Sequence, residues 1–278
     1  MTRAFSRRSL LKFGSAVIPM SAMGLRLPSF AADGGNLRLP IADTFPTQPA
    51  ELVREMVTVA HFDLKRVKEL VEARPSLARA AWDWGFGDWE TALGAASHMG
   101  NRPIAEYLIA NGARPSLFSA AMLGQIEVVK AFVAAQPGVQ RIRGPHSISL
   151  LAHAQAGGPG ARGVYDFLHA LPGAGADPEA PLAEDDRARL VGTYSFGIGA
   201  SQSIEVTIEH NNFLKTDQLT WTRKGTMGRP LYHLGDRVFY PAGAPAVRIR
   251  FVGESNGVTM SVTDGDVVLT ARRMQASK

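Results

Sequence analysis

The chain has 278 residues, 45% hydrophobic and 20% charged, so it is long enough for two globular domains and too polar for a multi-span membrane protein. Its formal net charge of +5 suggests a basic protein, but residues 1–32 contain five bases and no acid, and the rest of the chain has 25 bases and 25 acids. A basic nucleic-acid-binding surface is therefore not expected. The absence of cysteine excludes disulfides, thiolate metal sites and a cysteine nucleophile.

The first segment of the chain has the features of an export signal. Arg7 and Arg8 lie within the run Ser-Arg-Arg-Ser-Leu-Leu-Lys, and a modestly apolar stretch follows at residues 13–23. That stretch is too short to cross a hydrocarbon core of about 30 Å. The motif resembles the twin-arginine export consensus, which implies export of an already folded chain, to the periplasm or otherwise out of the cytoplasm. Small residues predict cleavage at Ala31 or the neighbouring Ala32.

Four similar segments follow, each with small residues in a first helix, a turn, and an apolar second helix. In the clearest segment Ala95 and Ala96 precede the turn at Gly100. The four turns fall at Asp63, Gly100, Gly124 and Gly157. The pattern resembles the ankyrin repeat, whose period is about 33 residues. The resemblance implies a helical solenoid over residues 51–172 with a concave surface that binds another protein.

An aromatic segment lies between the first two of these units. Trp82, Trp84 and Phe86 alternate along the chain, and Trp89 follows three residues later. Alternation suits a hairpin with one aromatic face. These four residues are candidate partner-binding residues, because tryptophan and tyrosine dominate the energetics of interfaces. The alternative is that the rings pack inside the protein.

The remaining polar candidates precede the fourth unit. Arg141, Arg143 and His146 are candidate contacts for an anionic partner, with a solvated loop as the alternative. His146 and His153 are the closest pair of histidines but lack a third ligand at metal-binding spacing, so no metal site is expected. His153 takes a small-residue position, where a hydrogen-bonded structural histidine is expected. No Gly-x-Ser-x-Gly elbow occurs, and the Ser-x-x-Lys at Ser9 lies in the export signal, so no catalytic residue and no cofactor is expected.

The C-terminal part of the chain changes to short alternating runs, predicted as strands over 203–209, 212–217, 238–240, 246–252, 258–263 and 267–271 and separated by Asn, Asp and Gly turn signals. This pattern predicts an antiparallel sheet rolled into a small barrel or half-barrel. Residues 190–194, 230–234 and 247–251 resemble the small β-domain found behind serine β-lactamase-like hydrolases. That resemblance implies an accessory module without a catalytic role.

The predicted fold class is α+β multidomain, an α-helical ankyrin-repeat solenoid followed by a small β-barrel. The predicted parts are a signal peptide (1–31), an extended segment (32–50), about four ankyrin repeats (51–172), a linker (173–189) and the β-domain (190–274). The predicted function is a non-catalytic periplasmic scaffold with an unidentified protein partner, no nucleic acid and no membrane span in the mature chain. The alternative is an accessory or immunity-like partner of a periplasmic hydrolase; a third reading is a hydrolase that uses a cavity of the β-domain.

Overall fold

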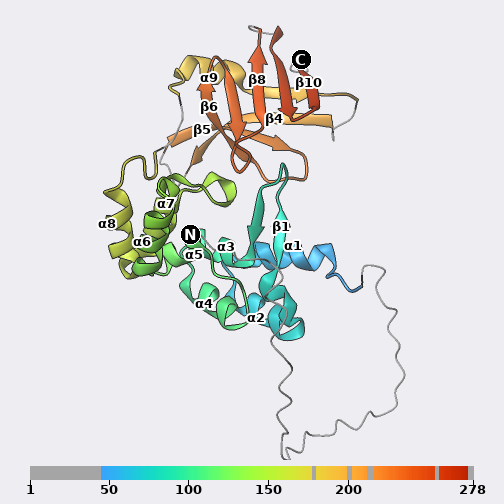
Figure 1. The fold of residues 1–278 in the computed structure, drawn as a ribbon. Helices are drawn as coiled ribbons and strands as arrows, with labels where there is room; N and C mark the ends of the chain where they lie inside the picture. Colours follow the sequence, from blue (N-terminus) through green and yellow to red (C-terminus); the bar gives the residue numbers. More distant parts are fainter. Residues whose placement is uncertain (1–44, 177–179, 199–201, 212–215, 254–256, 275–278) are drawn as a thin grey trace, which may run out of the picture. The chain divides into compact units, whose positions relative to one another are not determined.

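The computed structural model describes residues 45–176, 180–198, 202–211, 216–253 and 257–274. These residues form nine α-helices and ten β-strands (Figure 1). The export-signal positions Arg7, Arg8, Ala31 and Ala32 lie outside the described residues. Within the described ranges, none of the helices combines the length and the apolar character needed to cross a membrane.

The helices come first along the chain. The α-helices are α1 (Ala50–Val59), α2 (Leu64–Ala73), α3 (Ala92–His98), α4 (Arg102–Ala110), α5 (Leu117–Met122), α6 (Ile126–Ala135), α7 (Leu150–Ala156), α8 (Arg162–His169) and α9 (Glu184–Leu190). Short 3-10 helices are η2 (Pro75–Arg79), η3 (Val139–Arg141), η4 (Pro145–Ser147) and η5 (Gly158–Ala161). Side chains cap the N-termini of several helices. Asp63 accepts a hydrogen bond from the backbone N–H of Arg66 at the start of α2, and Thr91 accepts one from the N–H of Gly94 at the start of α3.

Close packing of the helices depends on small residues at their contacts. Helix α3 packs against α4 and α5, α5 against α6 and α7, and α7 against α8. Ala95, Ala96 and Ala121 are fully buried there, and their short side chains let the backbones approach. Gly100 ends the turn after α3 with φ 69°, and a Cβ at this position would lie 2.1 Å from the carbonyl oxygen of Ala156. Only glycine fits this turn.

The helices do not form the predicted ankyrin-repeat solenoid, and that prediction for residues 51–172 is wrong. A solenoid stacks its repeats on one continuous core. Here the described chain has short helices of six to ten residues, interrupted by 3-10 segments and a β-hairpin. They bury two separate hydrophobic clusters, one around Met56 and Ile104 and the other around Leu150 and Leu168. The helical region therefore has two hydrophobic cores instead of one continuous core.

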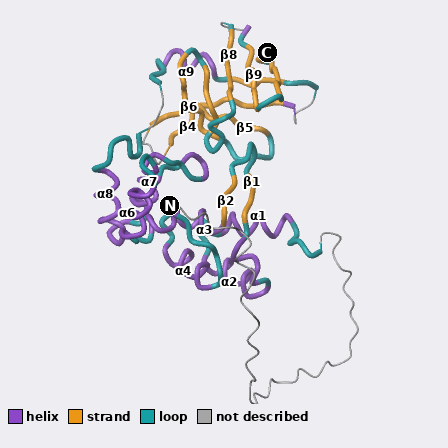
Figure 2. Tube along the Cα trace, viewed as in Figure 1, coloured by secondary structure: helices purple, strands orange, loops and turns teal. Residues whose placement is uncertain are grey.

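The hairpin between α2 and α3 consists of β1 (Ala81–Asp83) and β2 (Trp89–Thr91), which pair antiparallel. Side chains alternate between the two faces of a strand. In β2 the middle residue, Glu90, is buried, and its two neighbours are exposed. The backbone of the hairpin lies against α1 through β1 and against α3 through β2 (Figure 2), and the burial of Glu90 places its carboxylate inside the protein.

The second half of the described chain is a closed antiparallel barrel. Its strands are β3 (Gly192–Ser195), β4 (Ser203–Asn211), β5 (Thr216–Arg223), β6 (Arg229–Gly235), β7 (Val238–Pro241), β8 (Arg248–Val252), β9 (Thr259–Asp264) and β10 (Val267–Arg273). Pairing of β10 with β3 closes the ring, so a half-barrel is excluded. Tyr194, Phe239 and Phe251 fill its core, where Phe251 lies edge-on to both other rings.

Residues 44–278 form one compact unit, in which the β1–β2 hairpin contacts the barrel. Arg229 of β6 lies 3.2 Å from Asp88 and donates to the carbonyl oxygen of Gly85 at 3.1 Å. The rings of Phe86 and Trp221 lie 5.8 Å apart. A buried ion pair and an aromatic contact thus hold the hairpin between the helices and the barrel.

Candidate metal centre

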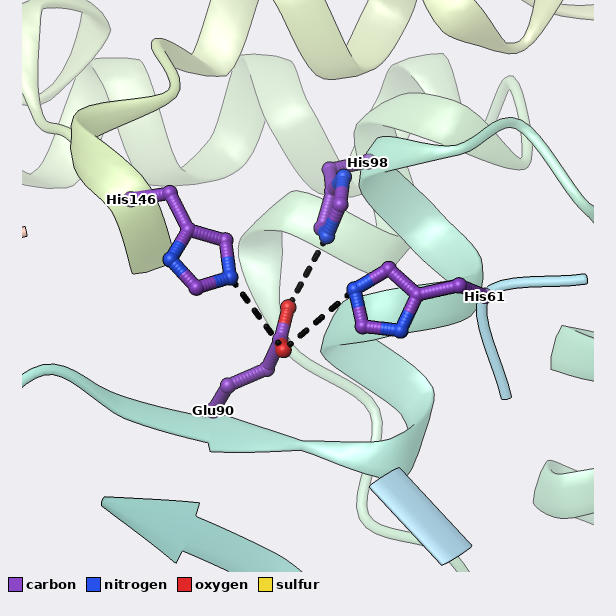
Figure 3. A group of neighbouring side chains, drawn as sticks. All are labelled: His61, Glu90, His98 and His146. Atoms are coloured by element: carbon purple, nitrogen blue, oxygen red, sulfur yellow. Dashed lines mark ion pairs between the residues drawn. The ribbon is translucent and has the colours of Figure 1, made fainter. Parts of the chain in front are cut away.

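Four side chains from separate parts of the chain converge on one point (Figure 3). Nε2 of His98 lies 2.9 Å from Oε1 of Glu90, and Nε2 of His146 and of His61 lie 3.4 and 3.5 Å from its Oε2. The four ligand atoms lie within 4.8 Å of one another. Three imidazole nitrogens therefore surround one carboxylate.

Different local structures deliver each of these side chains. Glu90 is the buried middle residue of β2, and His98 is the last residue of α3, eight positions later. His61 lies in the turn between α1 and α2. His146 lies in η4 with φ 56°, a left-handed conformation that is uncommon for a residue with a side chain. Backbone strain at a residue that points into a cluster favours a functional role for His146.

The far nitrogens of two histidines have partners that orient the rings. Nδ1 of His61 lies 3.0 Å from the carbonyl oxygens of both Val57 and Thr58. Nδ1 of His146 lies 2.9 Å from Oδ2 of Asp88, whose Oδ1 accepts the backbone N–H of His146 at 3.0 Å. A carbonyl or carboxylate partner at Nδ1 fixes the ring orientation and, in a neutral ring, the tautomer in which the lone pair of Nε2 faces the cluster.

Glu90 also accepts a hydrogen bond from a tryptophan side chain. The indole Nε1 of Trp84 donates to its Oε2 at 2.9 Å. The other oxygen, Oε1, and Nε2 of His98 are close but not aligned as a hydrogen bond, and neither has a hydrogen-bond partner among the described residues. Glu90 is 0% exposed, so this is a buried carboxylate with an unsatisfied oxygen. Such an arrangement is costly unless a cation or proton neutralises it.

Electrostatics in the cluster favour an ionised carboxylate. Burial by itself raises the pKa of Glu90, but the contacts with His146 and His98 outweigh it and hold that pKa well below its usual range. For His146, burial opposes the charged form, but Asp88 and Glu90 outweigh burial and raise the pKa to about 9. Burial lowers the pKa of His61 despite the nearby Glu90. Without a metal the cluster therefore holds an ion pair between Glu90 and protonated His146, and a metal ion bound at Nε2 of His146 would take the place of that proton.

The residues fit a transition-metal ion. Metal–ligand bonds of about 2.0–2.2 Å place neighbouring ligand atoms roughly 3.0–3.5 Å apart. The separations of 2.9, 3.4 and 3.5 Å between Glu90 and the three histidines agree with this spacing. Three imidazole nitrogens with one carboxylate oxygen suit zinc, iron, copper or nickel, and less well the oxygen-preferring calcium or magnesium. The oriented rings supply the supporting contacts that metal sites need.

The cluster opens onto a cavity of about 550 Å³. His61, His98 and His146 line this cavity, and Glu90 is not among the lining residues. The carboxylate therefore lies behind the imidazoles. A metal ion held by all four residues would be reachable from the cavity, because three of its ligands line the wall.

The structure distributes the predicted aromatic residues over different surroundings. Trp82 and Trp84 pack against the helical cluster, and Phe86 packs against the barrel core. Only Trp89 among these four residues is largely exposed, at 63%. Three of the four rings thus follow the packing alternative, and Trp84 has the additional role of binding Glu90.

The predicted basic residues also lie in different surroundings. Arg141 is exposed at the end of η3, whereas Arg143 lies in the cavity wall and donates to the carbonyl oxygens of Ser147 and Ala176. His146 belongs to the metal-type cluster and not to a solvated loop. His153 is fully buried with Nδ1 2.9 Å from the carbonyl oxygen of Ser149, as expected for a structural histidine.

The sequence analysis missed the cluster as a group. His61, Glu90 and His98 were not selected, and His146 was paired with His153, because only nearby positions were compared. The one local signal is His98, which follows a run of small buried residues in α3, where a polar ring needs a partner.

Comparison of the chain with protein-family models, with curated proteins and with solved structures gave no match in any of the three.

Proposed function

We propose that the protein binds one divalent transition-metal ion through His61, His98, His146 and Glu90, and uses it as a metal-dependent enzyme on a small molecule in the adjoining cavity. The observation that carries the proposal is the convergence of three Nε2 atoms on one buried carboxylate at the cavity wall. A metal at such a position can act as a Lewis acid on a bound oxygen. The chain itself supplies the ligands and the contacts that orient the rings.

This proposal replaces the non-catalytic scaffold role predicted from the sequence. That role depended on the concave surface of a solenoid, and the described helices form no solenoid. Three of the four aromatic residues assigned to the partner surface pack within the protein. The exposed Trp89 alone does not make an interface.

An export route for folded chains supports a metal centre. The resemblance of the segment around Arg7 and Arg8 to the twin-arginine consensus implies folding before export. A chain that folds first can take up its metal in the compartment of synthesis, where metal availability differs from that outside. Part of the proposal is therefore that this protein is exported with its metal bound.

Metal analysis of the purified protein, followed by titration of the metal-free protein with Zn²⁺ and Co²⁺, tests the proposal. We expect one ion per chain, and a visible Co²⁺ spectrum typical of nitrogen and oxygen ligands. His61→Ala removes one ligand at a partly exposed turn and should weaken binding by at least about tenfold.

His210→Ala is the matched control. His210 is an exposed histidine of β4 that pairs with Asp217, away from the cluster. It should bind the metal like the unchanged protein. Circular dichroism establishes that both variants fold. Equal metal affinity in the folded His61→Ala variant, or no uptake by the unchanged protein, would contradict the proposal.

A further inference from the structure

We infer that the cavity takes a small molecule with an apolar body and a single anionic oxygen group, of the aromatic carboxylate class, whose oxygen binds the metal. The inference rests on the proposed function and specifies its ligand. It is argued from the cavity walls, from the buried charges, and from the polar groups already engaged.

The walls of the cavity are apolar and partly exposed. Phe62, Met99 and Met227 line it and are 67%, 45% and 52% exposed, which is high for large apolar side chains. Trp84 and Tyr232 add aromatic surface. Apolar side chains that gather around one cavity mark a ligand site more often than isolated ones do. A volume of about 550 Å³ lies within the range of small-molecule sites.

The buried charges favour an anion at the metal. Asp88 and Glu90 each contribute one negative charge, and Arg229, 3.2 Å from Asp88, contributes one positive charge. Imidazoles that ligate a metal are neutral, so a bound divalent ion would leave one net positive charge in the cluster. A net buried charge is costly, and one anionic donor cancels it. Arg143 in the same wall adds a further guanidinium beside the cavity.

The walls offer little to a ligand with many polar groups. The hydroxyl of Thr58 donates to the carbonyl oxygen of Arg54 at 2.8 Å, and the hydroxyl of Ser149 accepts the N–H of Ala152 at 3.1 Å. The hydroxyl of Ser147, which also lines the cavity, accepts the N–H of Gly243 at 2.7 Å, so all three of these hydroxyls contact the main chain. A sugar or a peptide would leave polar groups without partners in such a cavity. A ligand with a single polar end leaves the fewest polar groups without a hydrogen-bond partner.

Three probes separate the contributions of body and charge. With Co²⁺-loaded protein, 3-phenylpropionate carries both features, acetate carries only the anionic group, and 3-phenylpropan-1-ol carries only the body. Calorimetric titration and the Co²⁺ spectrum measure binding. We expect 3-phenylpropionate to bind at least about tenfold more tightly than either other probe. Only this probe puts a phenyl ring against the apolar walls and a charged oxygen at the metal. It should also change the Co²⁺ spectrum.

Met227→Ser tests the apolar wall, since Met227 is exposed in a barrel turn and lies outside the metal cluster. It should weaken 3-phenylpropionate roughly threefold or more and leave Co²⁺ and acetate binding unchanged. Equal binding of acid and alcohol, or equal binding of 3-phenylpropionate and acetate, would overturn the inference. So would an unchanged Co²⁺ spectrum. Failure of the protein to bind Co²⁺ at all would instead overturn the proposed function.

Discussion

The barrel and the helical region bury different kinds of core. The barrel encloses aromatic and aliphatic side chains such as Tyr194, Phe239 and Ile249. The helical region also buries apolar residues, but among them lie a carboxylate, Glu90, and the histidines His98 and His153. Apolar burial stabilises a fold directly, whereas buried charges cost free energy unless they are neutralised. The barrel strands bury some polar side chains too, such as Arg229 and His233, but the helical region holds the cluster of one carboxylate and three imidazoles, whose cost a bound metal can offset.

The largest effect is expected in the barrel. Phe239→Ala removes a ring that is almost completely buried against Phe251 and should lower the free energy of unfolding by about 3–5 kcal/mol. Denaturant titration measures this change. Val268→Ala, at an exposed position, is the control, and its free energy of unfolding should lie within about 0.5 kcal/mol of that of the unchanged protein. The folded Phe239→Ala protein should bind Zn²⁺ normally. Reduced Zn²⁺ affinity would show that the two cores are not separable.

Removal of the metal should lower the free energy of unfolding by a similar amount. A ligand that binds only the folded state adds about 2.7–4.1 kcal/mol of stability at 100 to 1,000 times its dissociation constant. Denaturant titration with buffered Zn²⁺ and then with a chelator should show this difference. Glu90→Gln should abolish it, because the amide lacks the charge that attracts the ion. Zn²⁺ stabilisation that persists in Glu90→Gln would place the ion elsewhere.

Acid should destabilise the metal-free protein through His153. Burial lowers the pKa of His153 to about 4, compared with 6.5 in the unfolded chain. Between these values the unfolded chain binds a proton that the folded chain does not, so stability falls as the pH drops from 6.5 toward 4. The loss should reach about 3 kcal/mol.

Denaturant titrations between pH 4.5 and 7 measure this dependence in the metal-free protein. His153→Leu should lose the contribution, because leucine is apolar and has no proton to bind at a site beside Phe118. The same pH dependence in His153→Leu would assign it to other groups.

The smallest effect is expected at Asp88, which affects metal binding only through His146. Asp88→Asn replaces the carboxylate that orients His146 and should lower metal affinity by about 10–100-fold. Competition titration with Co²⁺ measures the affinity, and a changed Co²⁺ spectrum would separate altered ring orientation from loss of stability. Asp166→Asn, in an exposed ion pair with Arg162, is the control and should be neutral. Unchanged affinity in Asp88→Asn would leave Asp88 without a role in positioning.

Local patterns in the sequence were sufficient for parts of the fold. The predicted strand over 203–209 lies within β4, where buried Ile204 and Val206 flank exposed Glu205, an alternation visible in the sequence. The predicted strand over 267–271 lies within β10, although the first four residues of β10 are all exposed. The turns predicted at Gly100 and Gly124 have the positive φ that glycine allows. Most of β5 was missed, since residues 218–221 are all buried and show no alternation.

The sequence by itself determined the positions of turns, several strands and the small-residue contacts between helices, because each depends on residues a few positions apart. It misidentified the assembly of the helices, because similar helix pairs can surround one core or two. The metal cluster was decided only by the tertiary structure. His61 and His146 lie far apart in the chain, and only the hairpin bearing Glu90, held by Arg229, brings their nitrogens to one carboxylate.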